Sequence, residues 1–176
     1  GQPVVLRHLR DAVHQRIAYL TEDRKGKGLV LNMDLRSNVT LLNLRAHCHP
    51  LIDRRREEQA FQQAVERFDI RLRTAARTAA ELSGGNQQKV VIGKMLATDP
   101  SVVLLDEPSR GIDIGAKAEI HLILRQLADR GCGILLISSE LPEILRCADR
   151  IMVLRSGKIS NQWHAADVSA TQIAAA

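Results

Sequence analysis

The sequence predicts an α/β fold, with a parallel sheet flanked by helices. Apolar runs without polar alternation occur at residues 102–105, 133–138 and 151–154, and the segment 16–20 contains another. Such runs are typical of strands that are buried on both faces. Between them lie longer stretches in which apolar residues recur at helical spacing. Strands separated by helices indicate a parallel sheet.

The composition fits one globular domain: 176 residues, of which 45% are hydrophobic and 26% charged. Aromatic residues make up only 2%, which argues against a base-stacking surface, so we expect no nucleic-acid partner. The net charge of +5 is interpreted as a solvated surface, with a basic patch for phosphate, anionic lipid or an acidic partner as the alternative. No apolar run approaches the roughly 18 residues of a membrane span.

The three cysteines, Cys48, Cys132 and Cys147, lack CxxC spacing, and we interpret them as reduced thiols. The run His47-Cys48-His49 has no second pair of ligands nearby. A polar loop is therefore favoured over a metal site there.

The first part of the chain predicts a strand and then a helical insertion. The strand at 16–20 ends at a polar turn, 21–28, that contains two glycines. Residues 33–80 are rich in arginine, with apolar residues at helical spacing, such as Ala60, Ala64 and Phe68. We expect breaks in this insertion near Pro50 and in the biased stretch 73–81.

The stretch LSGGNQQKV, residues 82–90, places Ser83, Gly84 and Gly85 at the start of a predicted helix. Each glycine weakens a helix by roughly 1 kcal/mol relative to alanine. Two interpretations remain open from these residues alone: a plain turn, or a backbone that a phosphate approaches closely. The helix that follows has an apolar face and stops at Asp99-Pro100.

A pair of carboxylates, Asp106 and Glu107, follows the predicted strand Val102–Leu105. Functional groups of parallel sheets collect at the carboxyl ends of strands, although a lone Asp-Glu pair is more often a polar turn. Next come a helix over 116–128, the strand at 133–138, and a helix with Pro142 in its first turn. The last predicted elements are the strand 151–154 and a turn at Ser156-Gly157.

Taken in order, these blocks resemble the ABC-type ATPases. The resemblance is most specific to the second nucleotide-binding half of the double-domain ATPases that drive ribose-, xylose- and galactose-type sugar importers, and it covers nearly the whole chain. It implies a partial P-loop NTPase (RecA-like) parallel sheet with an inserted α-helical subdomain. The residues that carry it are IAYLTEDRKGKGLVLNMDLRSNVTL (17–41), LSGGNQQKV (82–90), LLDEPSRGIDIGAKAEI (104–120) and ISSELPEIL (137–145).

The resemblance also implies a division of the chain. Residues 1–32 would be the Q-loop region of the core, and 33–80 the helical subdomain. Residues 81–160 would hold the signature, Walker B, D-loop and switch regions, and 161–176 a C-terminal tail.

The resemblance implies ATP and Mg²⁺ as cofactors and a role for each matching residue. Asp106 would hold Mg²⁺ through water, and Glu107 would polarise the attacking water. Ser83, Gly84, Gly85 and Asn86 would contact a nucleotide held by a partner domain. Asp113 would lie at that interface, cap the following helix, or do both.

Three features depart from the family pattern. No GxxxxGK[ST] motif occurs, since Gly26-Lys27-Gly28 does not match it. Glu22 stands at the usual Q-loop glutamine, where it still offers an oxygen to Mg²⁺. Ser139 stands at the switch histidine and cannot replace its donor role. The first departure suggests truncation, with a P-loop strand missing between 134–138 and 151–154, so we expect little ATP binding or hydrolysis by this chain alone.

The implied partners are another ATPase half or second ABC domain, membrane permease subunits and, indirectly, a periplasmic sugar-binding protein. The implied location is peripheral, on the cytoplasmic face of the bacterial inner membrane. The arginine-rich insertion is interpreted as a solvated face, with docking to permease loops as the alternative. Two other functions stay open: an ABC-type ATPase that acts on DNA or ribosomes, and a degenerate, non-catalytic interaction module. The sequence does not encode which sugar is carried.

Overall fold

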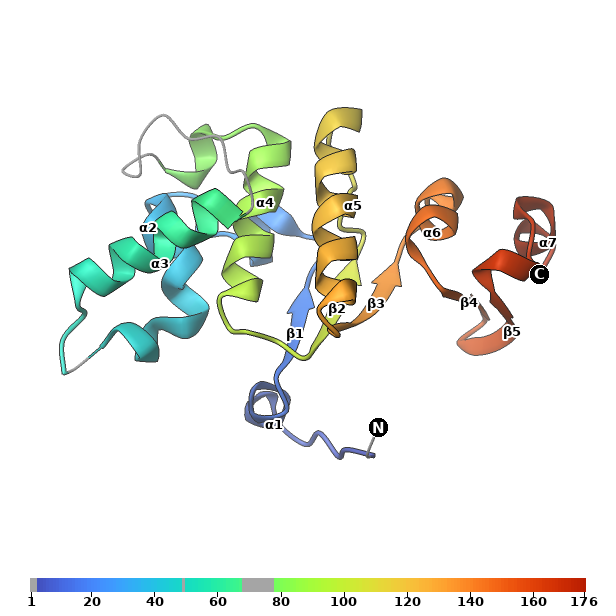
Figure 1. Cartoon of the computed structure of the whole chain (residues 1–176), viewed down its shortest axis with the longest axis horizontal. Helices are drawn as coiled ribbons and strands as arrows, with labels where there is room; N and C mark the ends of the chain where they lie inside the picture. Colours follow the sequence, from blue (N-terminus) through green and yellow to red (C-terminus); the bar gives the residue numbers. More distant parts are fainter. Residues whose placement is uncertain (1–2, 49, 68–77) are drawn as a thin grey trace. The chain divides into compact units, whose positions relative to one another are not determined.

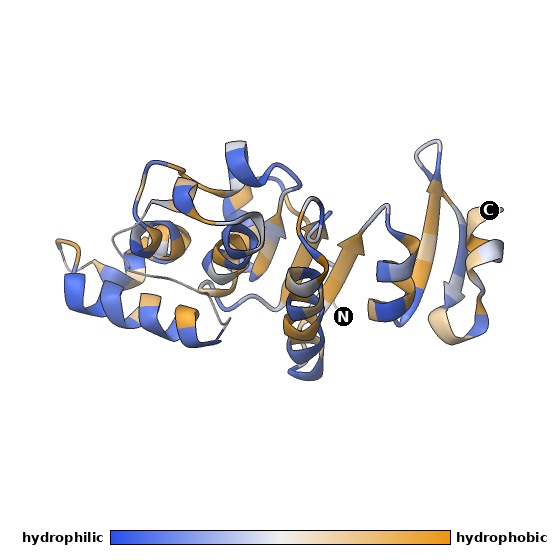
Figure 2. Cartoon of the chain, turned by 90° about the horizontal axis from the view of Figure 1, so that it is seen from above, coloured by the Kyte–Doolittle hydropathy of each residue, from blue (hydrophilic) through white to orange (hydrophobic). Residues whose placement is uncertain are grey.

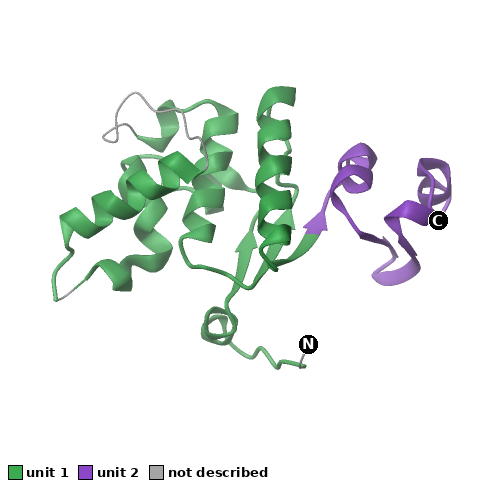
Figure 3. Cartoon of the chain, viewed as in Figure 1, with its two compact units in different colours: residues 1–135 green, residues 136–176 purple. Residues whose placement is uncertain are grey.

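The computed structural model describes residues 3–48, 50–67 and 78–176. The chain forms two compact units, residues 1–135 and 136–176, which are drawn in different colours in Figure 3. In the described ranges, no helix is both long and apolar enough to cross a membrane.

A three-stranded sheet forms the centre of the first unit, in the order β1-β2-β3. β1 pairs with β2 in parallel, and the register sets Ile17 opposite Val102 and Leu20 opposite Leu105. The three arrows point the same way in Figure 1, and the strands are coloured as hydrophobic in Figure 2. The predicted parallel sheet is therefore confirmed. Its strands are β1 (Ile17–Leu20), β2 (Val102–Asp106) and β3 (Gly133–Ile137).

Helix α4 (Gly84–Leu96) is buried on all sides and is therefore an interior helix of the first unit. It packs against β1, against α2 (Leu35–Thr40) and against α5 (Ile114–Asp129). Two lysines lie in this buried helix, and each has a partner. Lys94 Nζ donates a hydrogen bond to the Gly28 carbonyl at 3.1 Å, and Lys89 Nζ lies 2.5 Å from a carboxylate oxygen of Glu119 on α5. Loss of solvation lowers the pKa of Lys94.

The helix predicted over 116–128 is α5, which starts two residues earlier, at Ile114. Its apolar residues lie on one face and are buried, as their helical spacing predicts. These residues are Ala116, Ile120, Ile123, Leu124 and Leu127.

The prediction of a polar turn over 21–28 is wrong for its second part, because Arg24–Gly28 forms one turn of π-helix, η1. The amides of Gly28 and Leu29 donate to carbonyls five residues back, at 3.0 and 2.9 Å. The Asp23 carboxylate accepts a hydrogen bond from the Gly26 amide at 2.9 Å and caps the turn. A Cβ at residue 28 would lie 3.2 Å from Val91 of α4, so the glycine allows this turn to lie close to the buried helix.

The predicted helical insertion is confirmed for its described residues (Figure 1). The break expected near Pro50 lies between η2 and α3, while Phe68 and residues 73–77 lie outside the described ranges. Helix α1, near the N-terminus, was not predicted. The remaining helical elements of the first unit are α1 (Leu9–His14), η2 (Leu41–His47), α3 (Arg54–Arg67) and η3 (Ala79–Glu81).

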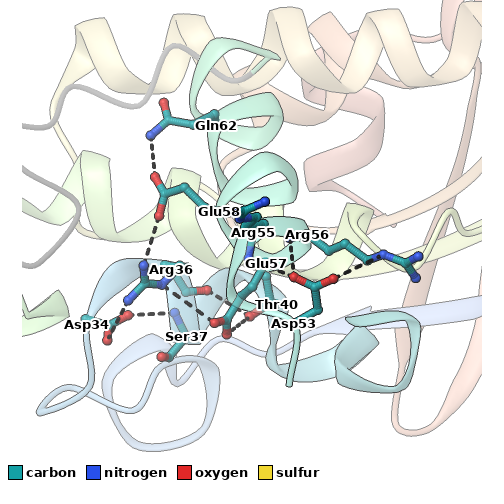
Figure 4. A network of polar contacts seen from close by, with 10 residues as sticks. All are labelled: Asp34, Arg36, Ser37, Thr40, Asp53, Arg55, Arg56, Glu57, Glu58 and Gln62. Carbon is teal, nitrogen blue, oxygen red and sulfur yellow. Dashed lines mark hydrogen bonds and ion pairs between the residues drawn. The ribbon is translucent and has the colours of Figure 1, made fainter. Parts of the chain in front are cut away.

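A polar network joins α2 to α3 (Figure 4). Glu57 is only 5% exposed, and its carboxylate accepts a hydrogen bond of 3.0 Å from the Thr40 hydroxyl. The Arg36 guanidinium lies 3.7 Å from the same carboxylate and donates to Glu58 at 2.9 Å. Because a buried carboxylate is costly without partners, this network fixes how the two helices pack.

The second unit corrects the prediction for strand 151–154, which was expected in the parallel sheet. β4 (Arg150–Arg155) instead pairs antiparallel with β5 (Lys158–His164) in a separate two-stranded sheet. Ser156 and Gly157 both have positive φ, 50° and 75°, as a two-residue hairpin turn requires. β5 was missed because its residues are mostly polar and exposed. The unit also contains α6 (Leu141–Cys147), η4 (Ala165–Asp167) and α7 (Ala170–Ala174).

Replacing Arg36 with methionine should lower the free energy of unfolding by about 1–3 kcal/mol, because the buried Glu57 carboxylate loses its cationic partner. Urea denaturation measures the change. Arg55→Met is the matched control, since the exposed Arg55 uses only its backbone amide in this network. Equal stability of the two variants would show that the network contributes nothing.

Candidate functional site

Ser83 is the N-cap of α4, so the serine and the two glycines stand at the start of a helix as predicted. Its hydroxyl accepts hydrogen bonds from the backbone amide and side-chain amide of Asn86, at 3.4 and 3.2 Å. The first N–H groups of a helix lack partners within the helix, and they carry partial positive charge. This end of α4 is therefore suited to an anionic group.

The N-terminus of α5 lies directly beside that of α4. A Cβ built on Gly85 would come within 2.6 Å of the Ala116 Cβ, so only glycine allows this close approach. Asp113 is the N-cap of α5 and accepts a hydrogen bond from the Ala116 amide at 2.9 Å. That hydrogen bond is the main cause that lowers the pKa of Asp113. The predicted capping role is confirmed, and the interface role of Asp113 stays a prediction.

A polar pocket of about 270 Å³ lies where the two helices begin. Lys89, which is 2% exposed, borders it together with its partner Glu119. The pocket thus combines two helix N-termini with the Lys89–Glu119 ion pair, in which the two charges offset each other. Its lining residues are Ser83, Gly85, Asn86, Lys89, Asp113, Gly115, Ala116 and Glu119.

Asp106 is the last residue of β2, and Glu107 follows it in an unusual backbone conformation. The φ of Glu107 is +50°, which costs a non-glycine residue of order 1–3 kcal/mol and is commonest at functional positions. The Glu107 carbonyl accepts a hydrogen bond from the Arg110 amide at 3.2 Å, which closes the turn.

Tyr19 of β1 donates a hydrogen bond from its hydroxyl to Asp106 Oδ2 at 3.0 Å. This bond is the main cause that raises the pKa of Tyr19. Sequence reasoning missed Tyr19, because the signal lies in the register of β1 against β2. No spacing along the chain reveals that register.

Glu22 follows β1 at the edge of the sheet where β2 ends. Its carboxylate lies 3.0 Å from the guanidinium of Arg110, and both side chains are more than half exposed. The parallel register therefore brings Glu22, Asp106 and Glu107 to the same edge. Carboxylate oxygens are the ligands that Mg²⁺ prefers, together with water and phosphate. Within the described ranges no three His, Cys, Asp or Glu side chains cluster tightly enough to hold a metal by themselves. The residues present therefore fit Mg²⁺ only if water and phosphate oxygens supply the remaining ligands.

Ser139 and the run His47-Cys48-His49 were also singled out from the sequence. Ser139 follows β3 and belongs to the second unit, whereas Glu22, Asp106 and Glu107 belong to the first. The backbone of Cys48 pairs with that of Ile52 in an isolated antiparallel β-bridge. His49 lies outside the described residues. The three cysteines are free thiols, as expected.

The parallel sheet with its carboxylate edge, the inserted helices and the capped N-terminus of α4 together define an ATP-binding cassette fold. Solved structures agree: the dimeric cassette MJ0796 bound to ADP and Pi matches with a TM-score of 0.75 and 20% identity, over 91% of this chain and 68% of that one. The cassette MJ1267 in its ADP conformation matches with a TM-score of 0.70 and 24% identity, over 88% and 63%.

The sequence profile of the ABC transporter family matches residues 3–110, and the chain belongs to this family. Relatives include a protein named ribose import ATP-binding protein RbsA 2 from Agrobacterium fabrum, 43% identical over 98% of this chain and 35% of the relative. Ribose import ATP-binding protein RbsA of Bacillus subtilis is 41% identical, again over 98% and 35%. The chain thus spans about a third of the length of these relatives.

Gly85→Ala should destabilise the fold by about 1–2 kcal/mol, because overpacking against Ala116 exceeds the gain in helix propensity. Adding Ala116→Gly should recover part of this loss by restoring the space. Gly133→Ala is the control, since its nearest contact would be an ordinary 3.6 Å. The close approach is refuted if urea denaturation shows Gly85→Ala to be as stable as the unchanged chain.

Proposed function

We propose that this chain is part of the ATP-hydrolysing, energy-coupling subunit of a monosaccharide importer of the ribose type. The names of its relatives support this proposal, because all of those cited are ribose import ATP-binding proteins. They favour import over an action on DNA or ribosomes and over a non-catalytic interaction module. The observation that carries the mechanism is the exposed N-terminus of the buried helix α4, with Ser83 as its cap.

In this proposal Ser83, Gly84, Gly85 and Asn86 complete an ATP site whose P-loop belongs to another domain. The sequence contains no GxxxxGK[ST] motif of its own. The serine hydroxyl and the free N–H groups of α4 would donate hydrogen bonds to the terminal phosphate of that nucleotide. Asp113, at the start of the neighbouring helix, would lie at the same interface.

The carboxylate edge would serve the site within this chain's own domain. Asp106 would hold Mg²⁺, with Glu22 as a second oxygen donor, and bound Mg²⁺ would neutralise charge on the transferred phosphoryl group. Glu107 would orient the attacking water and accept its proton. Ser139 would occupy the switch position without a histidine's ability to donate to phosphate, so this second site would turn over slowly.

The partners in this proposal are a second ABC domain and the permease subunits, with a periplasmic sugar-binding protein acting through the permease. The protein would lie peripherally on the cytoplasmic face of the bacterial inner membrane. The arginine-rich surface of the helical insertion is a candidate for contact with permease loops. Arg45, Arg54 and Arg55 are exposed there.

Ser83→Arg should reduce the ATPase activity of the assembled importer by about 100-fold, because a bulky cation replaces a phosphate donor at a helix N-terminus. Steady-state phosphate release measures it. Ser160→Arg is the control for an added exposed charge, since Ser160 is an exposed residue of β5. Unchanged activity of the Ser83 variant would contradict the proposed contact.

A further inference from the structure

The register of the parallel pair β1–β2 places Tyr19 beside the end of β2. Tyr19 lies opposite Leu104, and side chains two residues apart on a strand share a face of the sheet. Tyr19, Leu104 and Asp106 are therefore on the same face. A long side chain reaches its diagonal neighbour in such a pair, and the Tyr19 hydroxyl lies 3.0 Å from Asp106 Oδ2.

The two carboxylates that could hold a cation at this edge have different kinds of partner. Glu22 lies 3.0 Å from the Arg110 guanidinium, and this positive charge offsets its own. Asp106 accepts a hydrogen bond from the Tyr19 hydroxyl, which is a neutral donor. A neutral donor fixes a carboxylate while leaving its negative charge available to a metal ion. The contrast therefore favours Asp106 over Glu22 as the main carboxylate ligand of a cation.

We propose that Tyr19 is a positioning residue for the metal-binding carboxylate of Asp106, an inference that rests on the proposed ATPase function. Its hydrogen bond occupies Oδ2 and restricts rotation of the carboxylate, so that Oδ1 remains for Mg²⁺ or for a water bound to it. Hydrogen-bond partners of metal ligands commonly change metal affinity by about 10–100-fold when they are removed. Because Tyr19 is 58% exposed, we expect the lower end of that range.

The hydrogen bond itself is tested in the 176-residue chain, in which Tyr19 is the single tyrosine. The Raman doublet of tyrosine reports whether the phenol donates a strong hydrogen bond. It should show a strong donor in the unchanged chain and lose that signature in Asp106→Ala. An identical doublet in both proteins would overturn the proposal at its geometric basis.

The function of the hydrogen bond is tested in the complete importer ATPase loaded with ATP, with Mn²⁺ as the probe for Mg²⁺. Electron paramagnetic resonance measures free Mn²⁺, and the relevant site is the Mn²⁺ equivalent that Asp106→Ala removes. Tyr19→Phe should weaken this equivalent by about tenfold. Ser160→Ala is the matched control, because it removes another exposed hydroxyl, one that donates to the Val153 carbonyl at 3.2 Å.

The two measurements separate the possible failures. The positioning role would be overturned if the unchanged chain shows the Raman signature of a strong donor while Tyr19→Phe keeps the full Mn²⁺ affinity. That result would leave the proposed ATPase function standing. If Asp106→Ala removes no Mn²⁺ equivalent, both the metal assignment and the role of Tyr19 are wrong. A tenfold loss in Tyr19→Phe with normal affinity in Ser160→Ala supports the proposal, and equal unfolding midpoints of the two variants exclude a general loss of stability.

Discussion

The contact between the first turns of α4 and α5 is the constraint on which the candidate site depends. A Cβ at residue 85 would lie 2.6 Å from that of Ala116, and the Lys89–Glu119 ion pair joins the same two helices further along. Burial of α4 against β1, α2 and α5 leaves the helix little freedom to shift. The signature serine and the Asp113 cap are therefore held together as one rigid feature. Gly85 weakens the helix locally, but the close approach of α4 to α5 requires a residue without a Cβ at this position.

The sheet imposes a second constraint, through the register of β1 against β2. It brings Tyr19 and Glu22, from one strand and its following loop, to the carboxylates at the end of the other. The first unit thus presents hydrogen-bond donors at a helix N-terminus and carboxylates at a strand edge. Phosphate suits the donors and a divalent cation suits the carboxylates. Both groups are present in a Mg²⁺–nucleotide complex. Under the proposed function, the donors serve a nucleotide held by another domain and the carboxylates serve the site of this chain's own domain.

The local elements of this chain were largely predictable, because continuous apolar strands and one-sided helices leave a clear pattern. The strands β1, β2 and β3 follow from that pattern, while the start of α4 at Ser83 and the cap at Asp113 follow from residue types that favour helix N-termini. The π-helical turn was not predicted, because the close approach of Gly28 to Val91 joins residues far apart in the sequence. β5 was missed because it is polar and exposed. The contacts of Tyr19 with Asp106 and of Glu22 with Arg110 depend on register and on loop conformation, which no single stretch of sequence specifies.

The central claim is that Ser83 and the N-terminus of α4 contact a nucleotide held by another domain. The most direct measurement is a structure of the complete importer ATPase with ATP trapped by Glu107→Gln. We expect the Ser83 hydroxyl and the first N–H groups of α4 to lie about 2.7–3.2 Å from the terminal phosphate of an ATP bound to a different P-loop domain. A trapped ATP whose terminal phosphate contacts no atom of residues 83–86, in an otherwise closed assembly, would contradict it.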